Sequence, residues 1–416
     1  MPTSSGRLGV LLPGLGAVAS TFIAGVLAAR AGLAPPVGSL SETGHADGRP
    51  LIDALGLAPL DDLVFGAWDP YRVTALDAAR RAGVLDAALM DKLAPELMEI
   101  RAMPAVFERS WVPALTDTDN VKVGDSLADL AEQLRADVAA FRRDHHLDRV
   151  VAVWTGSTEA YRPPGPAHTS IETFEAALAA SDPSISPSQV YAWALVSEGV
   201  AVANGSPNLM FDFPAMRELA SREGVPVAGR DFKTGQTLVK TAIAPMLAAR
   251  MLGVHGWFST NILGNLDGLV LDEEENFRSK EVTKGGVLES ILDAEAHPEL
   301  YGDLSHLVRI NYYPPKGDDK EGWDNVDLFG WLGYPMQLKI NFLCRDSVLA
   351  APIVLDLARF MDLAARRGEA GVVDWLGFYF KEPMTIEPGG RPTHHLFEQE
   401  RALHAALADQ AEVPTA

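Results

Sequence analysis

The chain has 416 residues, 47% of them hydrophobic, and this length exceeds the size at which a single core usually keeps growing. Lys and Arg number 35 against 56 Asp and Glu, a formal net charge of −21 that argues against nucleic acid and anionic membranes as partners. The single cysteine, Cys344, excludes an intrachain disulfide framework and a thiolate zinc cluster, and it fits a reducing cytoplasm.

The first apolar segment, Leu8–Ala29, has the composition of a signal peptide or a short membrane span, but its glycines and proline stand where a strand would turn into a helix. We therefore predict a buried strand over Leu8–Leu12 and a helix over Ala17–Arg30, both in a soluble core. The turn between them contains Gly14, Gly16, Ala17 and Val18 in a G-x-G-x-x-A pattern. Such a turn lets the backbone approach a pyrophosphate at a helix N-terminus, although a tight turn without ligand gives the same pattern.

A dinucleotide-binding fold also carries an acidic residue at the end of its second strand. Asp69 ends the apolar run Leu63–Asp69 and is the favoured candidate. Glu42 has nearly the expected spacing but follows no obvious strand. The alternative for Asp69 is a helix cap ahead of Pro70.

Helical and strand patterns then alternate up to about residue 251. We expect helices from Ser126 to Arg143, from Thr169 to Ala180 (with Thr169 and Glu172 as a capping box), over Pro187–Glu198 and over Leu238–Met251, and strands over Arg149–Trp154, Gly199–Ala203 and Val225–Ala228. Polar segments follow these three strands. The alternation predicts an α/β fold with a doubly wound parallel sheet, and ligands gather at the carboxyl ends of such strands.

The composition changes after Met251. Strands rich in Val, Ile and aromatic residues are expected over Leu252–Leu263, Leu307–Tyr313 and Met336–Leu343, with a helical pattern only at Gly285–Leu292. After them we expect a helix from about Ala350 to Arg366, a strand-like Trp375–Phe380 and a final helix from about Thr393. A disordered tail is expected after Gln410. We therefore predict a discontinuous sheet domain over 1–238 and 350–416, interrupted by an α+β domain over 239–349.

Lysines are the strongest candidate functional residues of this acidic chain. Lys280 and Lys284 are four residues apart, so in a helix their like charges lie on one face and favour binding a phosphate or passing a proton to a carbonyl oxygen. Lys320 follows a Pro-Pro turn, and Lys381 ends an aromatic run where a lysine can be partly desolvated. For each lysine taken alone, a solvent-facing position is the plainer interpretation.

Other catalytic and metal-binding patterns are weak. His145-His146 and His394-His395 are adjacent pairs near helix ends, which favours surface histidines over metal ligands, and no metal site is predicted. The chain has no G-x-S-x-G motif, so acyl-transfer chemistry has little support.

Several segments, taken together, resemble the myo-inositol-1-phosphate synthase family, and the resemblance covers nearly the whole chain. The matching segments are Trp154–Glu159, Asn204–Pro207, Asp231–Thr237, Asn261–Gly268, Ser279–Lys284, Gly317–Lys320 and Asp346–Pro352. The resemblance implies a Rossmann-type domain built from both ends of the chain, with an inserted catalytic domain whose sheet also forms a homotetramer. It also implies a tightly held NAD that is regenerated within each turnover.

The implied reaction is a net isomerisation of glucose 6-phosphate. C5 is oxidised, the ketone is enolised at C6, C6 closes onto C1 as an aldol, and reduction gives inositol 1(3)-phosphate. By the same resemblance Lys280 handles the proton at O5, Lys320 and Lys381 stabilise negative charge at O1, and Lys284 binds phosphate.

The remaining implied roles are contacts. Asp231 and Asp346 are implied catalytic residues that orient the lysines and the sugar. Implied cofactor contacts, including those of the glycine turn, are Gly14, Gly16, Ala17, Val18, Asp69, Thr155, Thr158, Asn204 and Asp267, and implied substrate contacts are Lys233, Asn261, Gly264, Asn265, Leu266 and Lys284.

Three features depart from the family pattern. The glycine turn lacks asparagines that many relatives carry, Arg230 replaces an aspartate or other polar residue, and Leu266 stands where a polar residue is usual. Leu266 motivates an alternative, a cyclase that closes another sugar phosphate, such as fructose 6-phosphate, to a five-membered carbocycle. A catalytically silent NAD-binding scaffold and an ordinary dehydrogenase are further alternatives; the four retained lysines argue against the scaffold, and a dehydrogenase would accumulate NADH.

Overall fold

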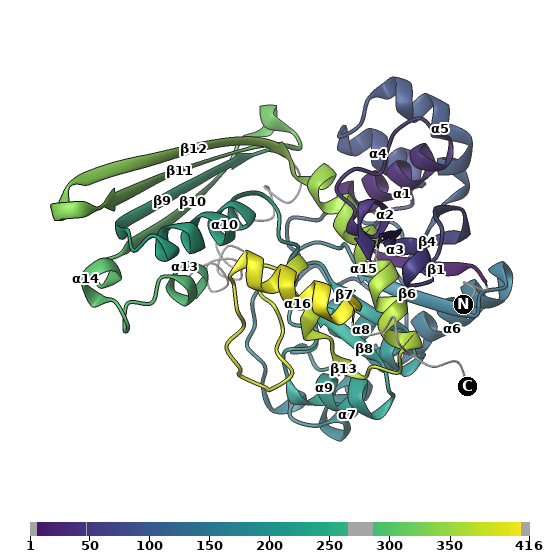
Figure 1. Cartoon of the computed structure of the whole chain (residues 1–416). Helices are drawn as coiled ribbons and strands as arrows, with labels where there is room; N and C mark the ends of the chain where they lie inside the picture. Colours follow the sequence, from purple (N-terminus) through teal and green to yellow (C-terminus); the bar gives the residue numbers. More distant parts are fainter. Residues whose placement is uncertain (1–5, 47, 265–285, 409–416) are drawn as a thin grey trace.

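The structure is a computed structural model that describes residues 6–46, 48–264 and 286–408. Two sheets organise this part of the chain (Figure 1). The larger sheet has seven parallel strands in the order β13-β8-β7-β6-β1-β4-β5. Its strands are β1 (Leu8–Pro13), β4 (Leu63–Asp69), β5 (Ala102–Pro104), β6 (Arg149–Trp154), β7 (Ala201–Asn204), β8 (Pro226–Gly229) and β13 (Gly371–Val372).

Helices cover both faces of this sheet, because its strands point apolar side chains toward each face. In β1, Val10 and Leu12 pack into one core and Leu11 into the other. The first core is formed with α1 (Ala17–Arg30), α4 (Ala75–Ala82), α5 (Ala87–Glu99), α15 (Asp346–Arg366) and α16 (Leu396–Ala408), and the second with α6 (Leu127–His145), α7 (Ile171–Ala179), α8 (Pro187–Ser197) and α9 (Pro214–Arg222). The predicted doubly wound α/β fold is confirmed.

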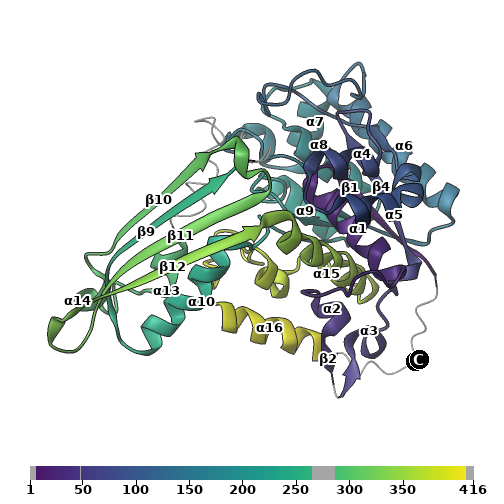
Figure 2. The same ribbon diagram turned by 90° about the horizontal axis from the view of Figure 1, so that it is seen from above.

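The strands of the smaller sheet lie between β8 and β13 in the chain, and the sheet has the order β10-β9-β11-β12. Its strands are β9 (Gly253–Leu263), β10 (Ser305–Tyr312), β11 (Asp319–Phe329) and β12 (Pro335–Arg345), and one face packs on α10 (Gly235–Ala249) and α13 (Gly286–Ile291), with α14 (Pro298–Tyr301) beside them. Figures 1 and 2 show α16 beside α10, so the C-terminal helix lies next to the connection between the sheets. A short segment after α1 holds α2 (Leu40–Thr43), β2 (His45–Ala46), β3 (Arg49–Pro50) and α3 (Leu51–Ala54).

The N-terminal prediction is confirmed in detail. Leu8–Ala29 forms β1 and most of α1. Among the described residues, none of the helices combines the length and the apolar character that crossing a bilayer demands. The predicted 1–238, 239–349 and 350–416 domain division stays a prediction.

Several predicted elements were wrong or shifted. Trp375–Phe380 was expected to be a strand, but Asp374–Tyr379 is a 3₁₀ helix, and the strand β13 comes before it. The capping box of α7 uses Ser170 and Thr173 in place of Thr169 and Glu172.

Two helices begin earlier than predicted, and several strands were missed, of which β11 is the longest. α10 begins at Gly235 and α15 at Asp346, because polar first turns hide a helix start from a search for apolar periodicity. Strand β11 was not predicted, since acidic and polar residues stand at many of its positions. The predicted disordered tail after Gln410 lies outside the described residues.

Candidate active site

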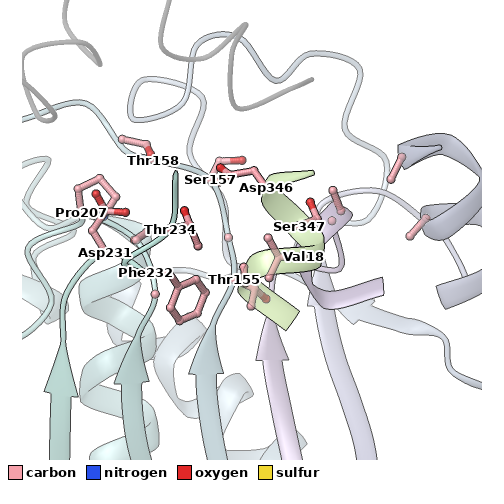
Figure 3. A pocket seen from close by; sticks show the side chains of 18 of the residues that line it. Val18, Thr155, Ser157, Thr158, Pro207, Asp231, Phe232, Thr234, Asp346 and Ser347 are labelled. Carbon is pink, nitrogen blue, oxygen red and sulfur yellow. The ribbon is translucent and has the colours of Figure 1, made fainter. Parts of the chain in front are cut away.

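A cavity of about 460 Å³ lies at the carboxyl edge of the large sheet, on the side of the small sheet (Figure 3). It is lined by the first residues of α1 (Gly16, Ala17, Val18), the loops after β6 (Thr155–Thr158), β7 (Gly205–Pro207) and β8 (Asp231, Phe232, Thr234), Gly264, Tyr312 and Gly317 at the ends of small-sheet strands, the start of α15 (Asp346, Ser347, Ala350), Lys381, and Ala78, Arg81 and Ala82 of α4. Because β4 and β6 lie on opposite sides of β1, the cavity sits where the strand order reverses, the expected ligand position of this fold.

The glycine turn forms a neutral wall of the cavity. Gly14 has φ +97°, and a Cβ built on it would lie 2.4 Å from the Cα of Gly156, so only glycine fits this crossing of two loops. The hydroxyl of Thr155 donates to the carbonyl of Gly14 at 2.8 Å and holds the two loops together. A Cβ on Gly16 would meet no atom within 4 Å, so the backbone there faces open space at the N-terminus of α1.

Asp69 lies behind this turn at the end of β4. One carboxylate oxygen accepts the backbone N–H of Leu15 at 2.9 Å, and the other accepts that of Tyr71 at 3.0 Å. Burial raises the pKa of Asp69, and the hydrogen bond from Tyr71 opposes this shift. Asp69 is therefore not a helix cap, because α4 begins at Ala75 under a cap from Thr74.

Glu42, the other acidic candidate, lies elsewhere. It forms an ion pair with the fully buried Arg359 of α15, with 2.6 Å between Arg359 Nη1 and Glu42 Oε1.

A second, smaller cavity of about 110 Å³ adjoins the turn. Gly14 and Asp69 line it together with apolar side chains, among them Val106, Phe107 and Leu115. An exposed helix N-terminus, a glycine turn, an acidic residue and an apolar slot match the diphosphate, ribose and base of a dinucleotide.

The predicted residues Thr158 and Asn204 differ in position. Thr158 lines the main cavity, but Asn204 does not. The Asn204 amide is buried, donates to the carbonyl of Asn208 at 2.7 Å and accepts the N–H of Ser206 at 3.1 Å, so it shapes the loop after β7.

Lys381, Asp231 and Asp346 form a charged wall of the cavity, and Lys320, which does not line the cavity itself, pairs with Asp346. Lys381 Nζ lies 2.9 Å from Asp231 Oδ1, and the backbone N–H of Lys381 donates to the Asp231 carbonyl at 2.7 Å. Lys320 Nζ lies 3.3 Å from Asp346 Oδ2. Lys381 thus follows a 3₁₀ helix and not the predicted strand, and Lys320 is the second residue of β11 and not part of a loop.

The N-terminus of α10 meets this wall. Lys320 Nζ lies 3.7 Å from the position that a Cβ on Gly235, the first residue of α10, would take. No side chain caps this 15-residue helix in the part of the chain described. Free N–H groups, the helix dipole and an ammonium group together favour an anion such as a phosphate.

Lys233 does not reach the cavity. Its side chain is buried and donates a hydrogen bond to Gln399 of α16. Burial lowers the pKa of Lys233 to about 7. Its assignment as a substrate contact stays a prediction that its position does not support.

The other implied substrate contacts divide into two groups. Gly264 lines the cavity, and Asn261 is buried three residues before it on β9. Asn265, Leu266 and Lys284 lie outside the described residues, as do the implied catalytic residue Lys280 and the implied cofactor contact Asp267.

Arg230 departs from the family pattern and lies behind the charged wall. It pairs with Glu382 and, at 3.1 Å, with Asp212. Burial raises the pKa of Glu382 to about 7, although Arg230 opposes this shift.

The histidine pairs do not share one environment. His146 ends α6 at the surface, but His394 is buried, so the surface prediction was wrong for it, and burial lowers its pKa to about 4. Within the described ranges, no group of three or more His, Cys, Asp or Glu side chains could hold a metal ion.

Sequence reasoning did not name several of the residues that line the cavity, among them Ser347, Tyr312 and Arg81. Ser347 follows Asp346 directly, and its N–H and hydroxyl both donate to the buried Asp318, at 3.2 and 2.8 Å. Its place in the Asp346–Pro352 segment was the available signal. Tyr312 and Arg81 lie in an ordinary strand and helix, and nothing in their local patterns marks them.

Known proteins similar to this chain agree with one another. The family model described as myo-inositol-1-phosphate synthase matches residues 8–407. An inositol-3-phosphate synthase 1 of Bacteroides thetaiotaomicron is 47% identical over 97% of this chain and 95% of its own length, and the Rattus norvegicus enzyme of that name is 35% identical over 95% and 77%. The crystal structure of inositol-3-phosphate synthase from Caenorhabditis elegans superimposes with a TM-score of 0.90 at 28% identity, covering 98% of this chain and 86% of that one.

Proposed function

This chain belongs to the myo-inositol-1-phosphate synthase family, and we propose on that basis how its cavity performs the family reaction. The chain is an isomerase-type, carbocycle-forming enzyme that uses NAD and converts glucose 6-phosphate to inositol phosphate. The observation that carries the proposed mechanism is the meeting of two chemically different walls in one cavity. One wall is a neutral glycine turn, and the other holds two lysine–carboxylate pairs beside a helix N-terminus.

The neutral wall fits the cofactor. NAD, when bound there, supplies the oxidation at C5 and the later reduction, so the reaction needs no outside oxidant. Gly16, Ala17 and Val18 would hold the diphosphate through the N-terminus of α1, and Thr155 and Thr158 line the path toward the charged wall. Asp69 keeps the turn in place through Leu15.

The charged wall would handle the sugar. Enolisation and aldol closure both put negative charge on an oxygen atom, and fixed ammonium groups stabilise such charge better than mobile water. Lys320 and Lys381 would stabilise the charge that develops at O1. Asp231 and Asp346 hold these two lysines, and Lys280 and Lys284, outside the described residues, keep their predicted roles at O5 and at the phosphate.

The small sheet supports the predicted homotetramer. In this single chain α10 and α13 cover one of its faces (Figure 1), and exposed apolar side chains, including Leu307, Trp323 and Leu343, stand on its strands. A large exposed apolar surface favours association, and a second copy of the chain would cover it. The cytoplasmic location predicted from the lone Cys344 is part of the same proposal.

A substrate comparison tests this function. Purified protein is incubated with catalytic NAD and either glucose 6-phosphate or fructose 6-phosphate, without added reductant, and products are followed by NMR. We expect an inositol phosphate from glucose 6-phosphate only. A five-membered carbocycle from fructose 6-phosphate would show that the mechanism is right but the substrate is fructose 6-phosphate. NAD binding without product from either sugar would favour a catalytically silent NAD-binding scaffold.

A further inference from the structure

A buried polar network beneath the charged wall has no place in the mechanism above. It runs from Asp324 of β11 through Gln236 in the first turn of α10 to Asn261 of β9, and all three side chains are at least 93% buried. Figure 1 shows α10 lying along the face of the sheet that carries β9 and β11. We propose that Asp324 is a positioning residue that sets, through Gln236, which end of the Asn261 amide is offered to the substrate. This inference rests on the proposed role of Asn261 as a substrate contact.

The surroundings of Gln236 fix the orientation of its amide. Its nitrogen lies 3.0 Å from the carbonyl oxygen of Thr260, 3.1 Å from that of Trp323 and 3.1 Å from Asp324 Oδ2. All three neighbours are oxygen atoms that accept hydrogen bonds, so the NH₂ group and not the carbonyl oxygen must face them. The carboxylate contributes most to this preference, because hydrogen bonds to ionised groups are the stronger ones.

The orientation passes from Gln236 to Asn261. With its nitrogen turned toward Asp324, Gln236 presents its oxygen to the Asn261 NH₂ group, which donates to it. The Asn261 oxygen is then left as a buried acceptor without a partner among the described residues. A sugar hydroxyl is a donor of the kind that such an acceptor needs. Asp324 therefore selects an acceptor, and not a donor, at the position of Asn261.

Asp324 is itself held in one orientation. Its other oxygen, Oδ1, accepts hydrogen bonds from the indole of Trp257 at 2.8 Å and from the hydroxyl of Ser259. The buried Lys240, one turn after Gln236 on α10, supplies a nearby positive charge that interacts with Asp324. These contacts keep the carboxylate aimed at Gln236.

The strand leaves room for this arrangement. Lys320, Gly322 and Asp324 alternate along β11 and so point to the same face of the sheet, toward α10. A Cβ on Gly322 would lie 2.9 Å from Gln236 Cγ, closer than real Cβ contacts. The glycine thus lets Gln236 lie across the strand between the catalytic lysine and the buried acid.

A double-mutant cycle tests the proposal with the full-length protein. In Asp324→Asn the new NH₂ group would face the Gln236 nitrogen, and two donors would then meet. This should favour a Gln236 amide turned by 180°, so kcat/KM for glucose 6-phosphate should fall about tenfold or more. Gln236→Met removes the link and should cost a similar amount. Because both act on Asn261 through one path, the double variant should be no worse than the poorer single variant.

Two further variants separate positioning from folding. Asp327→Asn, on the same strand but exposed and bonded to Asn325 and Gln337, should leave kcat/KM within twofold. Gly322→Ala displaces Gln236 without touching Trp257 or Ser259, the other two partners of Asp324, and should reproduce the loss. The Kd for NAD should stay within twofold of wild type in every variant.

The outcomes are distinct. The proposal is wrong if the losses in kcat/KM of the two single variants multiply in the double variant. It is also wrong if Asp324→Asn has the kcat/KM of the wild type. If the wild-type protein forms no inositol phosphate, the proposed function fails instead. The network is then tested by calorimetric titration of glucose 6-phosphate in the presence of NAD, where the same non-additive losses of affinity are expected, and multiplying losses would again contradict it.

Discussion

The two helix N-termini that face the cavity, those of α1 and α10, are built in opposite ways. At α1 no charged side chain of the turn lines the cavity, and Asp69 stands behind it, occupied with two backbone N–H groups. At α10 the ammonium group of Lys320 lies close by, and Lys381 and two carboxylates line the same wall. From this difference we infer a division of labour in which backbone groups would hold the cofactor and charged side chains would perform the chemistry.

The charged wall should give the largest effect when broken. Lys381→Met removes an ammonium group that would stabilise charge in the transition state, and we expect kcat to fall by roughly 10²–10³-fold or more. Steady-state kinetics measure this change, and fluorescence titration should show NAD affinity within threefold of wild type. Lys92→Met, at an exposed position of α5, is the matched control. Equal losses of kcat in both variants, or loss of NAD binding in Lys381→Met, would contradict the proposed division of labour.

The neutral wall should show the reverse pattern. Gly14→Ala puts a Cβ 2.4 Å from Gly156 at a positive φ, so the loops must separate. We expect NAD affinity to fall about tenfold or more and the free energy of unfolding to fall by roughly 1–3 kcal/mol. Gly25→Ala, in the helix α1 that follows the turn, places a Cβ that meets no atom within 4 Å and should raise stability by about 0.5–1 kcal/mol. Unchanged NAD binding in Gly14→Ala would show that the turn does not hold the cofactor.

A smaller effect is expected behind the neutral wall. Asp69→Asn keeps the size of the side chain but replaces one acceptor oxygen by a donor, so Leu15 or Tyr71 loses its partner. The expected cost is about 1 kcal/mol in chemical denaturation, together with a severalfold weaker affinity for NAD. Asp61→Asn, an exposed change before β4, should alter neither quantity. An Asp69→Asn protein as stable as wild type would show that Asp69 does not hold the turn in place.

The last effect depends on pH and concerns Lys233, the buried lysine that turns away from the cavity. Burial lowers the pKa of Lys233 to about 7, whereas its ordinary value is 10.5. Between these values the unfolded chain binds the proton and the folded chain does not, so this group makes stability rise with pH. From pH 7.5 to 9 the rise should be up to roughly 2 kcal/mol, and Lys233→Met should lose it. Urea unfolding at both pH values measures this difference, and a variant with the wild-type pH dependence would contradict it.

A contrast between apolar and polar strands explains which parts of the fold the sequence predicts. Strands β1, β4 and β6 lie where their continuous apolar runs predicted them, because a strand buried on both faces leaves that pattern. Strand β11 was missed, since Lys320 and Asp324 stand at inward positions that a core pattern reserves for apolar residues. The residues to which we assign a function are thus the ones that obscured the pattern of this strand.

The site was predictable only in part for a similar reason. Gly14, Asp69, Thr155 and Asp231 follow strand ends, where local pattern and fold class together predict ligand contacts. The pairing of Lys381 with Asp231, 150 residues away, has no local signal. The same holds for the turning of Lys233 toward Gln399 on the last helix. Such contacts depend on tertiary packing, which periodicity does not record.

The central claim is a redox-neutral cyclisation in which the cofactor is restored within each turnover. Glucose 6-phosphate that carries deuterium at C5 tests it directly, with substoichiometric NAD and NMR detection of the product. The account predicts an inositol phosphate that retains the deuterium, many turnovers per NAD and no accumulation of NADH, with product formation lost in Lys381→Met. Transfer of the deuterium from the sugar to NAD, with one reduced cofactor left for each sugar consumed, would contradict the account and identify an ordinary dehydrogenase.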